Sequence, residues 1–143
     1  MSNLNPLLGW AVWASLNSHN DLELILLKGH LYIEGALDSL LVKNDIKEYK
    51  NFSFHRKVSF LKQIKTNNKN ETDLIISVLY DLNRLRNKLA HEYKFDIRNG
   101  ELESWSLIVL ENFEGNKFTK YTYRTKITHA FSTLAKSLLE LME

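Results

Sequence analysis

The chain has 143 residues, of which 44% are hydrophobic and 25% are charged; this balance is typical of one folded domain and excludes a disordered chain. The absence of cysteine excludes disulfides and thiolate metal sites, and a net charge of +2 does not by itself indicate a nucleic-acid partner. One proline and five glycines force few turns, which favours helices over a many-stranded β fold. We therefore expect residues 1–143 to form a single helical domain.

Neither a membrane span nor a secretion signal is predicted. No apolar run approaches the roughly 18 residues that a spanning helix needs. Residues 1–16 are apolar, but no Lys or Arg precedes the hydrophobic stretch. A signal peptide would carry a positive charge there. We expect a cytoplasmic protein that does not associate with a membrane.

The first three helices are predicted from their start signals. Asn5-Pro6 places proline at the first position of a short apolar helix. Asn20-Asp21 caps a long second helix, whose apolar residues recur every three or four positions to about Lys43. After the polar linker 44–51, Ser53 caps a third helix that carries several cations.

Two glycines interrupt the predicted second helix. Gly29 and Gly35 lower its helix propensity, and we interpret both as points of close packing against another helix.

The second half of the chain is predicted to contain two further helices. Residues 71–93 and 122–142 each carry an apolar stripe at helical spacing. Between them, turns at 96–100 and 114–116 bracket residues 102–110, whose partial alternation and β-branched centre predict a short strand or irregular segment. The sequence therefore predicts an all-α bundle of four to five helices with a short non-helical or β excursion before the last helix.

Most catalytic signatures are missing. The chain has no Gly-rich phosphate loop, no G-x-S-x-G and no H-E-x-x-H, so we expect no cofactor and no metal. Four histidines stand alone in the sequence, and we interpret them as surface or packed residues: His19, His30, His55 and His129.

The fifth histidine closes the string Leu85 to Tyr93, which reads LRNKLAHEY. Arg86 is followed by the polar Asn87, and His91 comes five positions after the arginine. This spacing resembles the R-x4–6-H motif of nucleases in the HEPN superfamily, where a polar residue usually follows the arginine. With Tyr93 it becomes R-x4-H-x-Y, which resembles the toxins of HEPN–MNT toxin–antitoxin pairs.

The resemblance extends over roughly residues 20–95, where two long helices joined by a basic third helix are similar to small stand-alone bacterial HEPN proteins. Asp81 falls on the acid position of the wider pattern E-x3-K-R-x4-H, and Leu85 departs from its lysine. The resemblance implies an HEPN-like bundle that works as a homodimer and cleaves RNA as a toxin or defence ribonuclease.

The helical period separates the two motif residues. At about 100° per residue, Arg86 lies on the shoulder of the apolar stripe and His91 on the polar face, about 140° away. They would not meet at one phosphate unless the helix bends or ends near His91, or a second copy supplies the missing partner. The resemblance implies the second arrangement, in which two motifs face each other across a dimer cleft.

The motif residue types suit metal-independent RNA cleavage. Histidine is the side chain best suited to proton transfer near neutral pH, so His91 can move the proton of the 2′-hydroxyl or of the leaving 5′-oxygen, and Arg86 can hold phosphate oxygens. Asn87 can donate to phosphate or orient His91, and the expected product is a 2′,3′-cyclic phosphate. We assign supporting roles to three neighbours of the motif: Asp81, Arg84 and Lys88.

Each motif residue also has a structural interpretation. Arg86 can pair with Glu34 or Asp81, while His91 caps the helix end, where a cation is favoured. Tyr93 is either a core or interface aromatic or, as the resemblance implies, the residue to which an antitoxin of the nucleotidyltransferase type attaches AMP.

An alternative function is a non-catalytic regulatory or protein-interaction module, because small families resembling bacterial mannitol-operon regulators share this helix pattern. A second basic stretch, 117–126, interleaves cations with aromatics. It fits either a nucleic-acid contact or a solvated helix start whose aromatics are buried.

Overall fold

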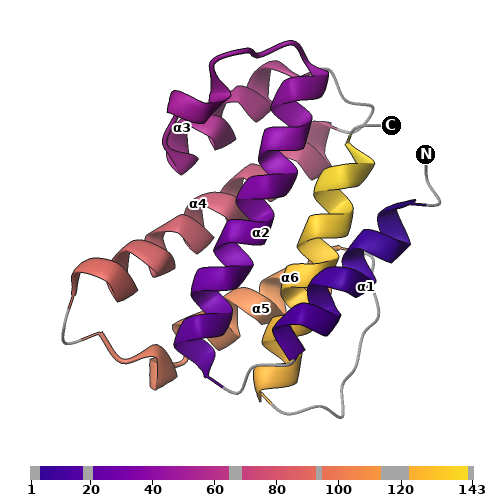
Figure 1. The fold of residues 1–143 in the computed structure, drawn as a ribbon. Helices are drawn as coiled ribbons and strands as arrows, with labels where there is room; N and C mark the ends of the chain where they lie inside the picture. Colours follow the sequence, from indigo (N-terminus) through magenta and orange to yellow (C-terminus); the bar gives the residue numbers. More distant parts are fainter. Residues whose placement is uncertain (1–3, 18–20, 65–68, 93–94, 114–122, 142–143) are drawn as a thin grey trace.

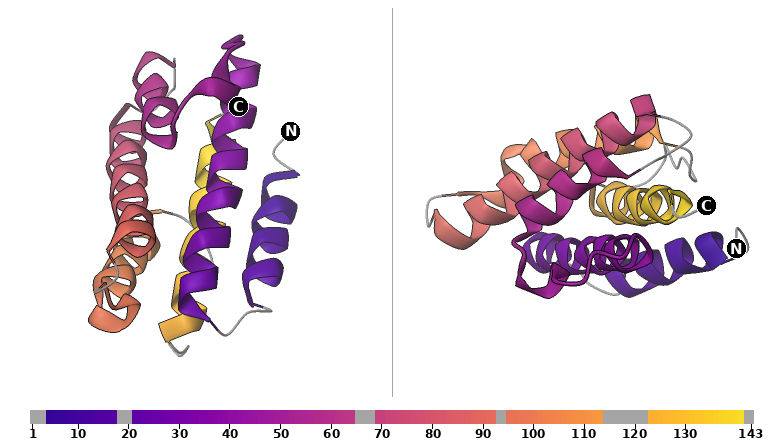
Figure 2. Two further views of the ribbon diagram at one scale, coloured as in Figure 1. Left: turned by 60° about the vertical axis from the view of Figure 1, so that its left-hand side comes forward. Right: turned by 90° about the horizontal axis from the view of Figure 1, so that it is seen from above.

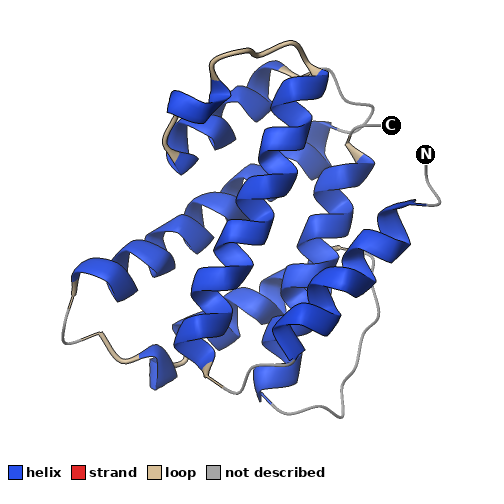
Figure 3. Ribbon diagram, in the orientation of Figure 1, coloured by secondary structure: helices blue, strands red, loops and turns tan. Residues whose placement is uncertain are grey.

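The computed structural model describes residues 4–17, 21–64, 69–92, 95–113 and 123–141. Within these ranges the chain is helical and contains no strand, which confirms the predicted all-α class (Figures 1 and 3). The described α-helices are α1 (Leu4–Asn17), α2 (Leu22–Lys43), α3 (Phe54–Ser59), α4 (Lys69–His91), α5 (Glu101–Asn112) and α6 (Tyr123–Glu140). Short 3₁₀ turns lie at Tyr49–Asn51, Phe60–Gln63 and Ile97–Asn99.

Helix α6 forms the centre of the bundle. It packs against α1, α2 and α5, while α4 packs against α2, α3 and α5 (Figure 2). A continuous set of buried aliphatic side chains joins these helices into one core, with Phe131 of α6 as its largest fully buried residue. No helix in the described ranges is long and apolar enough to cross a membrane.

Two predicted helix starts are confirmed by their capping bonds. The Asp21 carboxylate accepts a hydrogen bond of 2.9 Å from the backbone N–H of Glu23 at the start of α2. The Ser53 hydroxyl accepts one of 3.2 Å from the N–H of Arg56 at the start of α3. Each bond satisfies a donor that the first helical turn leaves without a partner. These caps fix where α2 and α3 begin.

The predicted strand or irregular segment at 102–110 is wrong, because these residues lie inside α5. Leu102, Trp105 and Val109 are buried at positions i, i+3 and i+7, which is helical spacing. Asn99 also accepts a 2.9 Å hydrogen bond from the N–H of Glu101 and so stabilises the helix start. The additional helix raises the number of described α-helices to six, one more than the upper predicted count.

Only one of the two glycines in α2 is a packing point. A Cβ at Gly29 would lie 2.5 Å from Cε1 of Phe131, so the predicted close approach to another helix is confirmed there. At Gly35 no described atom other than nearby backbone of α2 lies within 4 Å of such a Cβ, so the same prediction is wrong for that residue. Gly29 thus sets the distance between α2 and α6.

His129 of α6 is packed inside the bundle, as expected for a lone histidine, and its ring stacks on Trp13 of α1 with centroids 5.5 Å apart. Burial lowers the pKa of His129 from 6.5 to about 4. The folded state therefore favours the neutral ring. The stability that depends on a neutral His129 is complete above pH 6.5 and is lost as the pH falls toward 4.

The unfolded chain protonates His129 below pH 6.5, whereas the folded ring stays mainly neutral until the pH nears 4, so we expect a loss of up to about 2 kcal/mol of stability by pH 5. His129→Phe keeps the stack on Trp13 and removes the titration, so its free energy of unfolding should fall less between pH 7 and pH 5. Urea unfolding of both proteins at the two pH values measures the difference. Equal losses would contradict a pH dependence that originates at His129.

Candidate functional site

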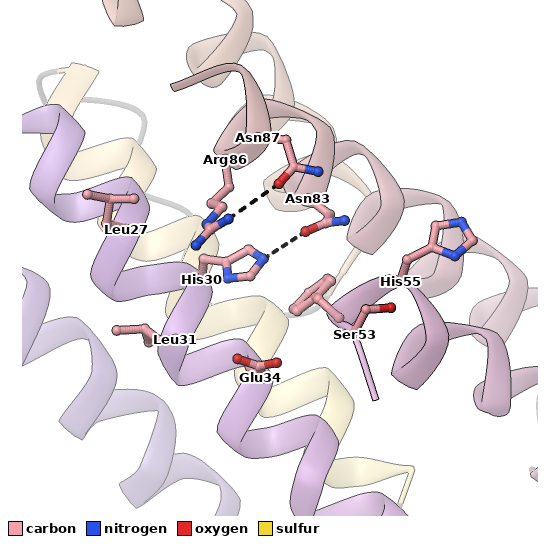
Figure 4. Close-up of a pocket in the computed structure, with 10 residues that line it drawn as sticks. Leu27, His30, Leu31, Glu34, Ser53, His55, Asn83, Arg86 and Asn87 are labelled. Carbon is pink, nitrogen blue, oxygen red and sulfur yellow. Dashed lines mark hydrogen bonds between the residues drawn. The ribbon is translucent and has the colours of Figure 1, made fainter. Parts of the chain in front are cut away.

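A pocket of about 450 Å³ opens between α2 and α4, beside α3 (Figure 4). Both long helices contribute polar side chains to its wall, and α3 contributes aromatic ones. Its lining residues are Leu27, His30, Leu31 and Glu34 from α2, Ser53, Phe54 and His55 from the start of α3, and Asn83, Arg86 and Asn87 from α4.

The sequence of α4 explains why its polar residues gather in this pocket. Val78, Leu82 and Leu85 are buried in the core and fix the rotation of the helix. Asn83, Arg86 and Asn87 stand at i, i+3 and i+4, and such positions share one side of a helix. The motif arginine and the amide after it therefore reach the same pocket, together with an amide one turn earlier.

Two hydrogen bonds organise the pocket wall. His30 Nε2 lies 3.1 Å from Asn83 Oδ1, and because that oxygen can only accept, the ring nitrogen donates. Arg86 Nη1 donates to Asn87 Oδ1 at 3.4 Å. Figure 4 shows both bonds side by side, with the guanidinium beside the imidazole.

Burial is the main cause that lowers the pKa of His30. The Asn83 hydrogen bond, the next largest effect, raises it in part, and the smaller effects of Arg86 and Glu34 lower and raise it in turn. The ring is 6% exposed and rests against Phe54 with centroids 4.1 Å apart. His30 is therefore mainly neutral near pH 7, with its single N–H directed at Asn83.

Arg86 has no acidic partner among the described residues. Glu34 instead pairs with the buried Lys57 at 3.1 Å, and Asp81 lies 3.8 Å from Arg84. The structural interpretation, in which Arg86 pairs with Glu34 or with Asp81, is thus wrong within the described part of the chain. A partly buried guanidinium without a carboxylate is available to an anionic ligand.

His91 lies outside this pocket. It is the last residue of α4 and is exposed, one helical turn beyond Asn87. The structure thus leaves His91 apart from Arg86, as the helical period predicts. It places Asn87 in the pocket with Arg86, although the same period sets Asn87 on the polar face with His91. Within one chain the two motif residues do not share a pocket.

The three assigned supporting residues lie on a different face of α4. Arg84 approaches Glu101 of α5 at 3.6 Å, and Lys88 approaches the same carboxylate at 3.2 Å. Asp81 pairs with Arg84 on this face. These contacts connect α4 to α5, and none of the three residues lines the pocket.

Sequence reasoning missed His30 and Asn83 as site residues. The spacing of Asn83 from Arg86 and Asn87 carried a signal, because i, i+3 and i+4 positions share a face. His30 gave no such signal, because its position depends on how α2 packs against α4. Tyr93 and residues 117–122 of the basic stretch lie outside the described residues.

No protein-family model, curated protein or solved structure matches this chain. Within the described ranges, no three or more His, Asp or Glu side chains gather closely enough to hold a metal ion.

Proposed function

We propose that this protein is a metal-independent endoribonuclease of the HEPN type, with toxin or defence activity, in which Arg86 and His91 act on the scissile phosphate and Asn87 supports them. The observation that carries the proposal is the guanidinium of Arg86, which lines an open pocket with no acidic partner in the described chain and two amides beside it. Such a group suits a phosphodiester, because guanidinium can hold two phosphate oxygens at once.

The proposed reaction needs only proton transfer and charge stabilisation. A base removes the 2′-hydroxyl proton, the 2′-oxygen attacks phosphorus, and the 5′-oxygen leaves with a proton from an acid. His91 supplies one of these proton transfers, because its exposed imidazole can accept or donate a proton. Arg86 stabilises the charge that develops on the phosphate oxygens. The products are a 2′,3′-cyclic phosphate and a 5′-hydroxyl.

The proposed enzyme is a homodimer, because Arg86 and His91 of one chain do not share a pocket. Next to Arg86 the pocket rim carries two exposed aliphatic side chains on one side of α2, Leu27 at 38% and Leu31 at 62% exposure. A second copy seated on this rim would cover both side chains. A shared site further requires that this copy bring its own His91 toward the Arg86 of the first copy.

The test of the proposed function is the chemistry of the products. Purified protein should cleave single-stranded RNA into fragments that end in 2′,3′-cyclic phosphate and begin with 5′-hydroxyl, and EDTA should not change the rate. Mass spectrometry of the fragments identifies both ends. If RNA stays intact, or if EDTA abolishes cleavage, the proposal fails and a regulatory interaction module is the better description.

A further inference from the structure

In the pocket, the side-chain oxygen of each of two asparagines already accepts a hydrogen bond. Asn83 Oδ1 accepts from His30 at 3.1 Å, and Asn87 Oδ1 accepts from Arg86 at 3.4 Å. An amide held by its oxygen turns its NH₂ group the other way. Figure 4 shows both Nδ2 atoms directed away from His30 and Arg86, on the same side. The wall therefore presents two amide donors beside one guanidinium.

We propose that this wall binds the phosphate backbone of an RNA chain, with Arg86 and the amide NH₂ groups of Asn83 and Asn87 as donors to phosphate oxygens and His30 as the residue that orients Asn83. The site deepens the proposed ribonuclease function and rests on it. It assigns a second donor residue, Asn83, and a positioning residue, His30, that lie outside the R-x4-H motif.

The arginine of the pocket is the group that can attract an anion. The guanidinium of Arg86 is the cation of the lining, and Glu34 is its carboxylate. Glu34 does not pair with Arg86, because it lies 3.1 Å from Lys57, which also pairs with Asp38 at 2.8 Å. Two neutral amide donors and one cation can then act together on phosphate oxygens, which accept from several donors at once.

His30 can orient Asn83 because its own position is fixed. The ring is buried against Phe54, and it follows Gly29, where α2 is pressed against α6. Without the His30 donor, the Asn83 amide would be free to turn its oxygen toward the phosphate, where it would repel the ligand.

A non-cleavable probe separates binding from catalysis. A 2′-O-methyl RNA oligonucleotide lacks the attacking hydroxyl, and fluorescence anisotropy reports its affinity. Asn83→Asp keeps the shape, removes the donor and adds a negative charge, so affinity should fall about ten- to a hundredfold. The control Asn99→Asp adds the same charge at an exposed residue whose side-chain oxygen still accepts from Glu101, and should bind like wild type.

The positioning role of His30 is tested by rescue. His30→Leu keeps an apolar side chain against Phe54 and removes the donor, so it should weaken binding about tenfold. In His30→Gln the terminal amide can donate to Asn83 again, and affinity should recover. A purely structural role predicts that binding follows the melting temperature of the variants rather than the presence of a donor.

The outcomes separate the site from the proposed function. Wild-type binding that Asn83→Asp weakens, without any cleavage of ordinary RNA, keeps the phosphate site and overturns the ribonuclease. Cleavage of RNA together with equal probe affinity for Asn83→Asp and Asn99→Asp overturns the phosphate site. If His30→Gln binds no better than His30→Leu, the positioning role of His30 is wrong.

Discussion

Arg86→Ala and His91→Ala are each expected to reduce RNA cleavage by about 10²–10⁴-fold, since each removes a positioned group that acts on the phosphate or its proton. His91 is exposed at the end of α4, so its loss should cost under about 0.5 kcal/mol of stability. Arg86 is partly buried, and its loss should cost more because its stem packs beside the core. Initial cleavage rates and thermal melting of the purified variants measure both effects.

In cells, expression of the wild type should arrest growth and expression of either variant should not. Cleavage that survives both substitutions would contradict the assignment of Arg86 and His91. It would leave the interaction module as the function.

Mixing the two inactive variants tests whether one site takes residues from two chains. If Arg86 of one copy works with His91 of the other, a mixed dimer contains one site with both native residues. Random mixing of equal amounts should then restore about one quarter of wild-type activity, since about half of the dimers are mixed and one of their two sites is intact. No recovery after subunit exchange would contradict the shared site.

The proposed dimer face has a matched control on the same helix. Leu31 and Val42 both belong to α2 and are 62% and 54% exposed, but only Leu31 lines the pocket. Leu31→Asp should yield a monomer in sedimentation and abolish the recovery in the mixing experiment. Val42→Asp should leave the dimer mass and the recovery unchanged.

Local signals in the sequence were sufficient to predict most of the fold. Asp21 and Ser53 accept the capping bonds expected of them, because a cap depends on residues within one turn. Residues 102–110 were misassigned because Ile108 and Val109 suggested a strand, whereas burial of Leu102, Trp105 and Val109 follows a helical period. Packing of α5 on α6 decides between the two patterns.

Only part of the candidate site could be predicted. The separation of Arg86 from His91 followed from helix geometry alone, and the structure places them accordingly. The contact between His30 and Asn83 joins residues 53 positions apart, and its existence depends on how α2 lies against α4. No local pattern specifies that arrangement, so His30 was interpreted as an isolated histidine.

The second large effect is a loss of stability expected at Gly29, where α2 packs closely against α6. Gly29→Ala should destabilise the protein, because the new Cβ would meet three ring atoms of Phe131 at 2.5–2.7 Å. Phe131 is fully buried and its ring lies 5.0 Å from that of Trp105, so it has little room to move. Overpacking of this kind costs about 1–3 kcal/mol, more than the roughly 0.5–1 kcal/mol that alanine gains in a helix, so the net change should be a loss of up to about 2 kcal/mol.

Gly35→Ala is the matched control on the same helix. No described atom other than nearby backbone of α2 lies within 4 Å of its added Cβ, so only the gain in helix propensity remains and stability should rise by about 0.5–1 kcal/mol. Urea unfolding should therefore give opposite signs for the two glycines. Phe131→Leu in the Gly29→Ala background should cost less than the sum of the single changes, since the shorter side chain relieves the overlap. Strict additivity, or equal signs at both glycines, would contradict a close contact between α2 and α6 at Gly29.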